Sequence, residues 1–325
     1  MCIRDSRGGG RSTLYDFFVQ TPLHKRPQAE LDFYPIVADF GTAQQEFHIG
    51  TGSIATPGTI KGLFQVHAEL CTLPMREIVR PAVELARNGV VLNRLQAYIF
   101  SVVGPIYRST PGARFIYASR EAPDRLAGEG ENFRQPELAD ALELLAIEGE
   151  RLFYRGEMGA ALVDACRSGG GYLQQADLEA YTVLQRRPLG YRYRDARILT
   201  NPAPSSGGSL IRFAHALLEP HDPGTFGTDR HLCLLSDVMR QTNLARLEKV
   251  QPGADGSGDM LQPETISRFR AALAGHPMNS RGTTHISVVD GQDNAASLTL
   301  SNGEGSGYVL PGTGIMLNNM LGEED

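Results

Sequence analysis

Apolar residues recur at helical spacing through much of the first 275 residues. In residues 75–88, Ile78, Val79, Ala82, Val83 and Ala86 share one helical face, so we expect a helix there. The same periodicity, with start and stop residues at the expected ends, predicts further helices. These cover approximately residues 57–71, 136–149, 157–168, 175–181, 208–218, 228–249 and 264–274, with two short helices within 93–109.

Local signals assign the remaining early segments. Residues 12–18 are rich in aromatic and β-branched side chains and predict a short strand, and alternation over 188–201 predicts two more. Prolines interrupt residues 21–47, which we expect to be a loop. Thr56 is placed to cap the helix that follows it, with Pro57 at the first helical position.

The pattern changes near residue 283. Thr284, Ile286 and Val288 alternate with the residues between them, which predicts a strand with two different faces. A turn at 290–293 and a return strand over 295–301 complete a β-hairpin. Helices therefore dominate before this point, and strands and glycine turns dominate after it.

Composition narrows the class of protein. The chain has 325 residues, a formal net charge of -6 and 41% hydrophobic residues, which is typical of a globular protein. The acidic balance argues against a nucleic-acid partner, and no apolar run is long enough for a membrane span. The four cysteines lie far apart and the histidines lack ligand spacing, so we expect no metal site and no dense disulfide framework.

Several common catalytic and nucleotide-binding motifs do not occur. The sequence has no GxxxxGK followed by Ser or Thr, no HExxH and no GxSxG. The run Gly303-Glu304-Gly305-Ser306-Gly307 has Tyr308 where GxGxxG requires the third glycine, so a dinucleotide-binding fold has little support. We interpret residues 303–314, which begin with this run, as a backbone-lined loop near a catalytic centre. A turn-rich connection without a role in catalysis is the alternative.

One dipeptide could carry chemistry by itself. If the bond between Gly282 and Thr283 breaks, Thr283 holds a hydroxyl and a free α-amine on one residue. The amine has an ordinary pKa of about 8 and can accept the hydroxyl proton, so no histidine base is needed. The alternative is that Thr283, Thr284 and His285 favour the start of a strand, in which His285 packs and forms hydrogen bonds.

The stretch Thr283-Thr284-His285-x-Ser287-Val288-Val289-Asp290 resembles the processing-site signature of the γ-glutamyltransferase (γ-glutamyltranspeptidase) family. Further segments resemble that family in the same order along the chain. They are Gly52-Ser53-Ile54-Ala55-Thr56-Pro57-Gly58-Thr59, Pro81-Ala82-x-x-Leu85-Ala86-x-x-Gly89, Phe153-Tyr154-x-Gly156, Gly169-Gly170, Asp177-Leu178-x-x-Tyr181, Pro204-Ser205-Ser206-Gly207-Gly208 and Gly314-Ile315-Met316-Leu317-Asn318-Asn319. The resemblance covers nearly all of residues 12–325.

The resemblance implies an α+β fold of the N-terminal-nucleophile hydrolase type. This is a four-layer αββα sandwich, with two stacked sheets between helices, and we expect it to be incomplete at both ends here. The resemblance also implies a proenzyme that cuts itself between Gly282 and Thr283 into a large and a small subunit, which form a heterodimer. We expect residues 12–282 to be the large-subunit portion and 283–325 the start of the small subunit. Residues 1–11 are expected to be extraneous or disordered.

The family also implies roles for particular residues. Thr283 becomes the nucleophile and forms an acyl-enzyme. Ser301, or Thr299 if the register differs, falls where the family has a hydroxyl near the amine of the nucleophile. Asn302 lies near a family asparagine that helps to hold substrate. No metal and no organic cofactor is implied.

Several positions depart from the family's substrate anchors. Phe18 follows Asp16-Phe17 where the family has an arginine, and a phenylalanine cannot make a bidentate contact with a carboxylate. Met320 replaces a Gln or Glu, and Glu323 and Glu324 stand for the acidic pair that grips the substrate amine, in a shifted register. The family's oxyanion hole is expected beyond residue 325, so we expect this chain by itself to be inactive.

The resemblance therefore predicts a self-processing γ-glutamyltransferase-like enzyme. It would attack the γ-glutamyl amide of glutathione or a related small-molecule amide and pass the acyl group to water, an amino acid or a peptide. Two alternatives stay open. Phe18 and Met320 favour an acylase of the same fold with another acyl specificity, and an uncleaved homologue would act as a binding protein. The resemblance implies a periplasmic or secreted location, with the cytoplasm as the alternative.

Overall fold

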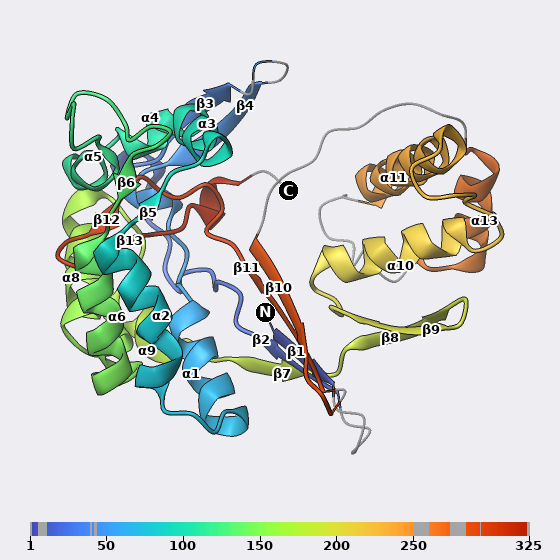
Figure 1. The fold of residues 1–325 in the computed structure, drawn as a ribbon, viewed down its shortest axis with the longest axis horizontal. Helices are drawn as coiled ribbons and strands as arrows, with labels where there is room; N and C mark the ends of the chain where they lie inside the picture. Colours follow the sequence, from blue (N-terminus) through green and yellow to red (C-terminus); the bar gives the residue numbers. More distant parts are fainter. Residues whose placement is uncertain are drawn as a thin grey trace. The chain divides into compact units, whose positions relative to one another are not determined.

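The structure is a computed structural model that describes residues 2–5, 12–39, 41, 44–249, 260–273, 284–292 and 294–323. The chain divides into two compact units. Unit 1 comprises mainly residues 16–184 and 300–325, and unit 2 comprises residues 2–15 and 185–299. Both units contain helices and strands (Figure 1), which confirms the predicted α+β class.

Most helices of unit 1 are those that the periodicity predicts. They are α1 (Thr59–Leu70), α2 (Met75–Asn88), α3 (Arg94–Val102), α4 (Gly104–Tyr107), α5 (Pro111–Tyr117), α6 (Pro136–Glu148), α7 (Arg151–Tyr154), α8 (Glu157–Gly169) and α9 (Gln175–Ala180). Helices α2 and α6 run side by side (Figure 1). The predicted cap of α1 is wrong: Thr56 pairs with Gln20 in a β-bridge, and Gly58 precedes the first helical residue instead.

The predicted loop over 21–47 is wrong in its second half, which contains a β-hairpin. The hairpin is formed by β3 (Tyr34–Asp39) and β4 (Gln44–Ile49), which pair antiparallel. Phe47 is 3% exposed and packs in one cluster with the fully buried Ile106. Each strand of a two-stranded sheet has a free edge, so β3 tolerates Pro35.

Short strands and 3₁₀ turns complete unit 1. They are β5 (Val90–Val91), β6 (Asn132–Phe133), β12 (Val309–Leu310), β13 (Ile315–Met316), η1 (Gln28–Glu30), η2 (Thr51–Ser53) and η3 (Met320–Gly322). The main core cluster joins Phe153, Tyr154 and Tyr181 with Leu310 and Leu317 from the end of the chain. These apolar side chains leave water together, so the segment after residue 300 folds against the helices of unit 1.

A five-stranded sheet contains most of the strands of unit 2 in the order β10-β11-β1-β2-β7. Its members are β1 (Cys2–Asp5), β2 (Thr13–Asp16), β7 (Leu184–Arg186), β10 (Thr284–Val289) and β11 (Ala295–Leu300). The strand expected near residue 12 and the late hairpin are therefore confirmed. Part of the segment expected to be extraneous or disordered forms β1, which pairs antiparallel with β11 on one side and β2 on the other.

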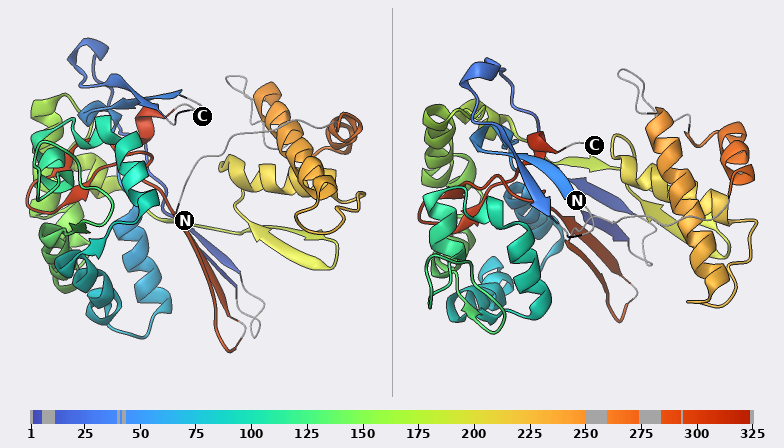
Figure 2. Two further views of the ribbon diagram at one scale, coloured as in Figure 1. Left: turned by 45° about the horizontal axis from the view of Figure 1, so that its top comes forward. Right: turned by 90° about the horizontal axis from the view of Figure 1, so that it is seen from above.

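The remaining elements of unit 2 are a hairpin and a helical bundle. They are β8 (Leu189–Tyr193), β9 (Ala196–Thr200), α10 (Ser206–Leu218), α11 (Asp229–Lys249) and α13 (Pro263–Ala271). The three helices gather in one bundle, with the β8–β9 hairpin next to α10 (Figure 2). Phe213, Val238 and Phe269 are almost fully buried between them. In the described part of the chain, no helix is both long and apolar enough to cross a membrane.

Candidate active site

The structure describes only some of the predicted site residues. Gly282, Thr283 and Glu324 lie outside the described residues. The others are Thr299 on β11, Ser301 and Asn302 directly after that strand, and Glu323 after η3. The division at residue 283 into large- and small-subunit portions stays a prediction.

Strand β10 begins one residue after Thr283, and its residue His285 forms hydrogen bonds with three hydroxyl groups. His285 Nδ1 lies 2.7 Å from Thr299 Oγ1, while His285 Nε2 lies 3.0 Å from Ser287 Oγ and 3.2 Å from Ser297 Oγ. Alternation along the two neighbouring strands puts these side chains on one face. His285 therefore forms hydrogen bonds within the sheet, and the Thr299 hydroxyl is engaged with its ring.

The turn between β10 and β11 is fixed by one carboxylate. Asp290 accepts hydrogen bonds from the backbone N–H groups of Gln292 and Asn294 at 2.8 and 2.9 Å. It accepts a third from Asn294 Nδ2 at 2.9 Å. These bonds favour the ionised form and lower the pKa of Asp290, the side-chain amide of Asn294 making the largest contribution. The hairpin that follows Thr283 thus ends in a well-bonded turn.

The buried side chain of Asn319 organises the glycine-rich run after β11. Its Oδ1 accepts the backbone N–H groups of Glu304 and Gly305 at 3.0 and 3.1 Å, and its Nδ2 donates to the His48 carbonyl at 3.3 Å. Gly303 has a φ of 61°, and a Cβ there would collide with Asn319 and Glu323. A side chain at this positive φ would be strained and would displace both neighbours, so glycine is favoured at this position.

Ser301 and Asn302 are held at the start of the same loop. Asn302 Nδ2 donates to the carbonyl oxygens of Met316 and Leu317 at 3.2 and 3.4 Å. Ser301 Oγ accepts the backbone N–H of Gly303 at 3.1 Å. Both residues are exposed. The structure therefore brings two of the predicted site residues together on an ordered, solvent-facing segment.

Glu323 carries a polar atom without a partner. Its Oε1 is buried and has no hydrogen bond within the described ranges of the chain. The carboxylate lies against Gly303, so it belongs to the same loop cluster as Asn302. A buried carboxylate oxygen is costly unless it is paired. Among the described residues, no donor offsets this cost at Glu323.

Phe18 is 56% exposed, and hydrogen bonds hold its backbone in place. The Tyr181 hydroxyl donates to the Phe18 carbonyl at 2.7 Å, and the Phe18 N–H donates to Asp16 Oδ1 at 3.2 Å. Burial raises the pKa of Tyr181, so its phenol stays protonated and keeps this hydrogen bond.

The described residues hold no cluster of metal ligands, and the buried Cys166 has an unreactive thiol. No group of three His, Cys, Asp or Glu side chains is placed to hold a metal ion among those residues. Cys166 is buried, and that burial raises the pKa of its thiol to about 11. A thiol with so high a pKa is a poor nucleophile at neutral pH.

Sequence reasoning treated Asn318 and Asn319 only as parts of a motif and missed their structural roles. Asn318 forms two hydrogen bonds with Ala55, and Asn319 holds the glycine-rich loop. The sequence does signal such a role, because two adjacent amide side chains directly follow the apolar residues 315–317. Their partners could not be identified, because these lie far away in the sequence.

A comparison with protein-family models gives one match over residues 26–324, to the family described as gamma-glutamyltranspeptidase. The chain belongs to this family. The match spans the whole stretch that carries the resemblance, apart from its first residues, and the predicted family is therefore confirmed.

Curated relatives include both acylases and glutathione hydrolases. "Acylase ACY 1 proenzyme" of Pseudomonas sp. (strain SE83) is 31% identical over 302 residues, which are 86% of this chain and 53% of the relative. "Glutathione hydrolase proenzyme" of Escherichia coli (strain K12) is 27% identical over 301 residues, which are 84% of this chain and 50% of the relative. The chain thus spans about half the length of the curated relatives it matches.

Solved structures share the fold. Cephalosporin acylase from Bacillus halodurans matches with a TM-score of 0.76 and 20% identity, covering 98% of this chain and 60% of that one. Gamma-glutamyltranspeptidase from Helicobacter pylori matches with a TM-score of 0.66 and 19% identity, covering 86% of this chain and 79% of that one. The fold is that of the N-terminal-nucleophile hydrolases, as predicted.

Proposed function

We propose that this chain carries the processing site and the nucleophile of an N-terminal-nucleophile acyl-transfer enzyme. The observation that carries this proposal is the family match, which continues across Gly282 and Thr283 to residue 324. The names of the Pseudomonas and Escherichia coli relatives, both called proenzymes, support self-processing.

In the proposed processing step, Thr283 Oγ attacks the carbonyl carbon of Gly282. An ester forms, the bond from that carbon to the Thr283 nitrogen breaks, and the hydroxyl proton passes to the released amine. Water then hydrolyses the ester, which leaves a carboxylate on Gly282 and both a hydroxyl and an α-amine on Thr283. Glycine before the nucleophile permits the backbone conformation that this attack needs.

In turnover, the freed α-amine of Thr283 acts as the base. Its ordinary pKa of about 8 lets it take the Oγ proton while Oγ attacks the substrate amide. We assign the supporting hydroxyl to Ser301 rather than Thr299. Thr299 Oγ1 already shares a hydrogen bond with His285 Nδ1, whereas Ser301 lies exposed at the start of the glycine-rich loop, where its Oγ accepts the Gly303 N–H.

A γ-glutamyl donor is the first candidate substrate. Its α-ammonium group is a cation of the kind that the buried, unpartnered Oε1 of Glu323 would bind. Asn302 lies on the same loop cluster and has its side-chain carbonyl available, because its Nδ2 makes the bonds to the backbone. The names of the glutathione hydrolase relatives agree with this donor.

An acylase whose acyl specificity is not γ-glutamyl is the second candidate. The exposed ring of Phe18 offers an apolar contact and no charge for a substrate carboxylate. The 31% identity to an acylase proenzyme agrees with this reading. An uncleaved homologue that only binds a ligand is the remaining alternative.

Two chromogenic amides separate these functions in the full-length protein. γ-Glutamyl-p-nitroanilide and glutaryl-p-nitroanilide differ only in the α-ammonium group. A kcat/KM at least about 100-fold higher for the γ-glutamyl compound, equivalent to about 2.7 kcal/mol, supports a γ-glutamyl enzyme. Equal or faster turnover of the glutaryl compound supports an acylase. No turnover, together with an intact bond before Thr283, supports a binding protein.

A further inference from the structure

A groove of about 660 Å³ lies in unit 1, and none of the described residues assigned above to the active site lines it. It is formed by α5, the loop after it, β6 and the first turn of α6, and Gly314 closes one side. Small-molecule sites commonly have volumes of about 300–1,000 Å³. The groove is therefore large enough for a compact organic ligand.

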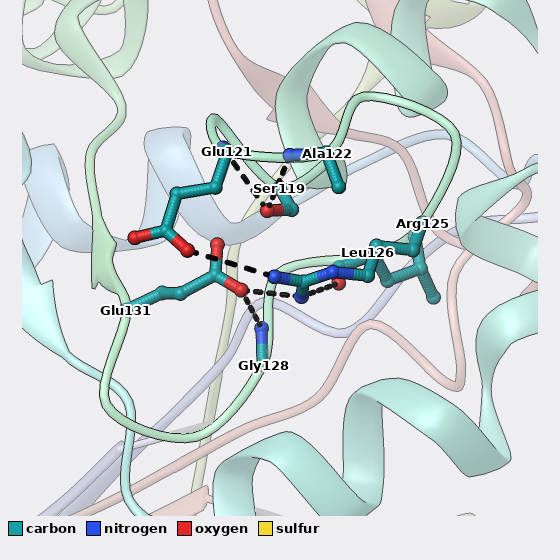
Figure 3. A network of polar contacts seen from close by, with 7 residues as sticks. All are labelled: Ser119, Glu121, Ala122, Arg125, Leu126, Gly128 and Glu131. Carbon is teal, nitrogen blue, oxygen red and sulfur yellow. Dashed lines mark hydrogen bonds and ion pairs between the residues drawn. The ribbon is translucent and has the colours of Figure 1, made fainter.

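The loop that forms one wall is held in place by polar contacts (Figure 3). Ser119 Oγ accepts two backbone N–H groups of the turn that follows it, each at 3.2 Å. Glu131 accepts the Gly128 N–H at 3.1 Å and forms an ion pair with Arg125. A hydrogen bond from Ser119 and these contacts lower the pKa of Glu131. The wall is thus formed before any ligand binds, which lowers the entropic cost of binding.

Two phenylalanine rings give the groove an aromatic lining. Phe133 packs edge-on against Phe100 at 5.3 Å and stacks on Tyr117 at 5.7 Å between ring centroids, so its position is fixed by other rings. Phe115 also lines the groove and is 76% exposed. Both rings line the groove and offer apolar surface to a flat apolar ligand, whose binding would remove that surface from water.

The charge of the lining differs from that of the whole chain. The chain has a formal net charge of -6, yet Arg114, Arg120 and Arg134 line the groove. The Arg114 guanidinium donates to a backbone carbonyl at 2.6 Å. No hydrogen bond or ion pair joins Arg120 or Arg134 to another described residue. Of the two lining glutamates, Glu131 is already paired, which leaves Glu137 as the one opposing charge.

We propose that this groove binds a small aromatic carboxylate. The ring packs with Phe115 and Phe133, and the carboxylate pairs with the guanidinium groups of Arg120 and Arg134. The proposed site uses no residue that we assign to acyl transfer. Binding therefore persists in a Thr283→Ala variant.

The test is isothermal titration calorimetry of the full-length protein with three probes. 3-Phenylpropionate carries the ring and the charge, 3-phenylpropionamide carries only the ring, and acetate carries only the charge. The proposal predicts one site for 3-phenylpropionate, binding at least about tenfold weaker for the amide, and no measurable heat from acetate. Equal affinity for the acid and the amide would overturn the proposed role of the arginines.

Variants locate the site. Arg134→Gln and Arg120→Gln should each weaken binding of 3-phenylpropionate about tenfold. Phe133→Leu should weaken binding of both 3-phenylpropionate and 3-phenylpropionamide. Arg76→Gln, an exposed residue of α2, is the matched control and should change nothing. Unchanged binding of 3-phenylpropionate in the folded Arg120→Gln/Arg134→Gln double variant contradicts the proposal. Loss of binding in Thr283→Ala would place the ligand in the acyl-transfer site instead.

Discussion

Asn318 and Ala55 lie 263 residues apart and form a reciprocal pair of hydrogen bonds. The Ala55 N–H donates to Asn318 Oδ1 and Asn318 Nδ2 donates to the Ala55 carbonyl, both at 3.1 Å. Asn318 is 5% exposed and Ala55 is fully buried. These two hydrogen bonds fix the segment that follows β13 to the segment that precedes α1.

Asn318→Ala should lower the free energy of unfolding by about 2 kcal/mol, because it leaves the buried N–H and carbonyl of Ala55 without partners. Urea denaturation measures this change. Gln292→Ala is the control, since Gln292 is exposed in the hairpin turn and its backbone makes the contact with Asp290. Equal stability of the two variants would mean that the pair does not hold the segment.

Glu323→Gln should weaken turnover of γ-glutamyl-p-nitroanilide. The amide cannot neutralise an ammonium group, so kcat/KM should fall about tenfold or more, through a higher KM. Turnover of glutaryl-p-nitroanilide should not change, because that compound has no ammonium group. Glu148→Gln, an exposed residue at the end of α6, serves as the control. A similar loss with both compounds would show that Glu323 only supports the fold.

Tyr181 and Tyr154 offer a matched pair of buried phenols. Tyr181 donates to the Phe18 carbonyl and Tyr154 to the Pro57 carbonyl, each at 2.7 Å. Replacing either by Phe should lower the free energy of unfolding by about 1 kcal/mol. Only Tyr181→Phe should also change kcat/KM, because it frees the backbone beneath Phe18. Equal kinetics for the two variants would remove Phe18 from the proposed substrate site.

Glu131 should make stability depend on pH. Its pKa is lowered below the ordinary value of 4.5, first by the hydrogen bond from Ser119. A lowered pKa in the folded state adds stability that is present above 4.5 and is lost as the pH falls through the folded value. Glu131→Gln should therefore melt at a lower temperature than the parent at neutral pH, and the difference should shrink in acid. Glu129→Gln in the same loop should show no such difference at any pH.

The sequence predicts the long elements well and the short ones poorly. Residues 75–88 show a clear apolar stripe and form α2 as expected. Strands β3 and β4 were not predicted because Pro35 and the polar residues of β4 obscure their alternation, while burial of Phe47 in the tertiary structure stabilises the hairpin. Thr56 has the chemistry of a helix cap, but its backbone pairs with Gln20 instead.

At the site, the sequence identifies residues and not their partners. Ser301, Asn302 and Glu323 could be selected by resemblance, and the structure places Ser301 and Glu323 against Gly303. The engagement of Thr299 with His285 depends on how two strands align, which no local pattern determines. The lack of a hydrogen bond from any described residue to Glu323 Oε1 is likewise evident only in the folded loop.

The central claim is that Thr283 is freed as an N-terminal nucleophile by cleavage after Gly282. The most direct measurement is the intact mass of the purified full-length protein beside its Thr283→Ala variant. The account predicts two fragments that meet between Gly282 and Thr283 in the parent and a single uncut chain in the variant. A single uncut chain in both proteins, or the same cut in both, would contradict it.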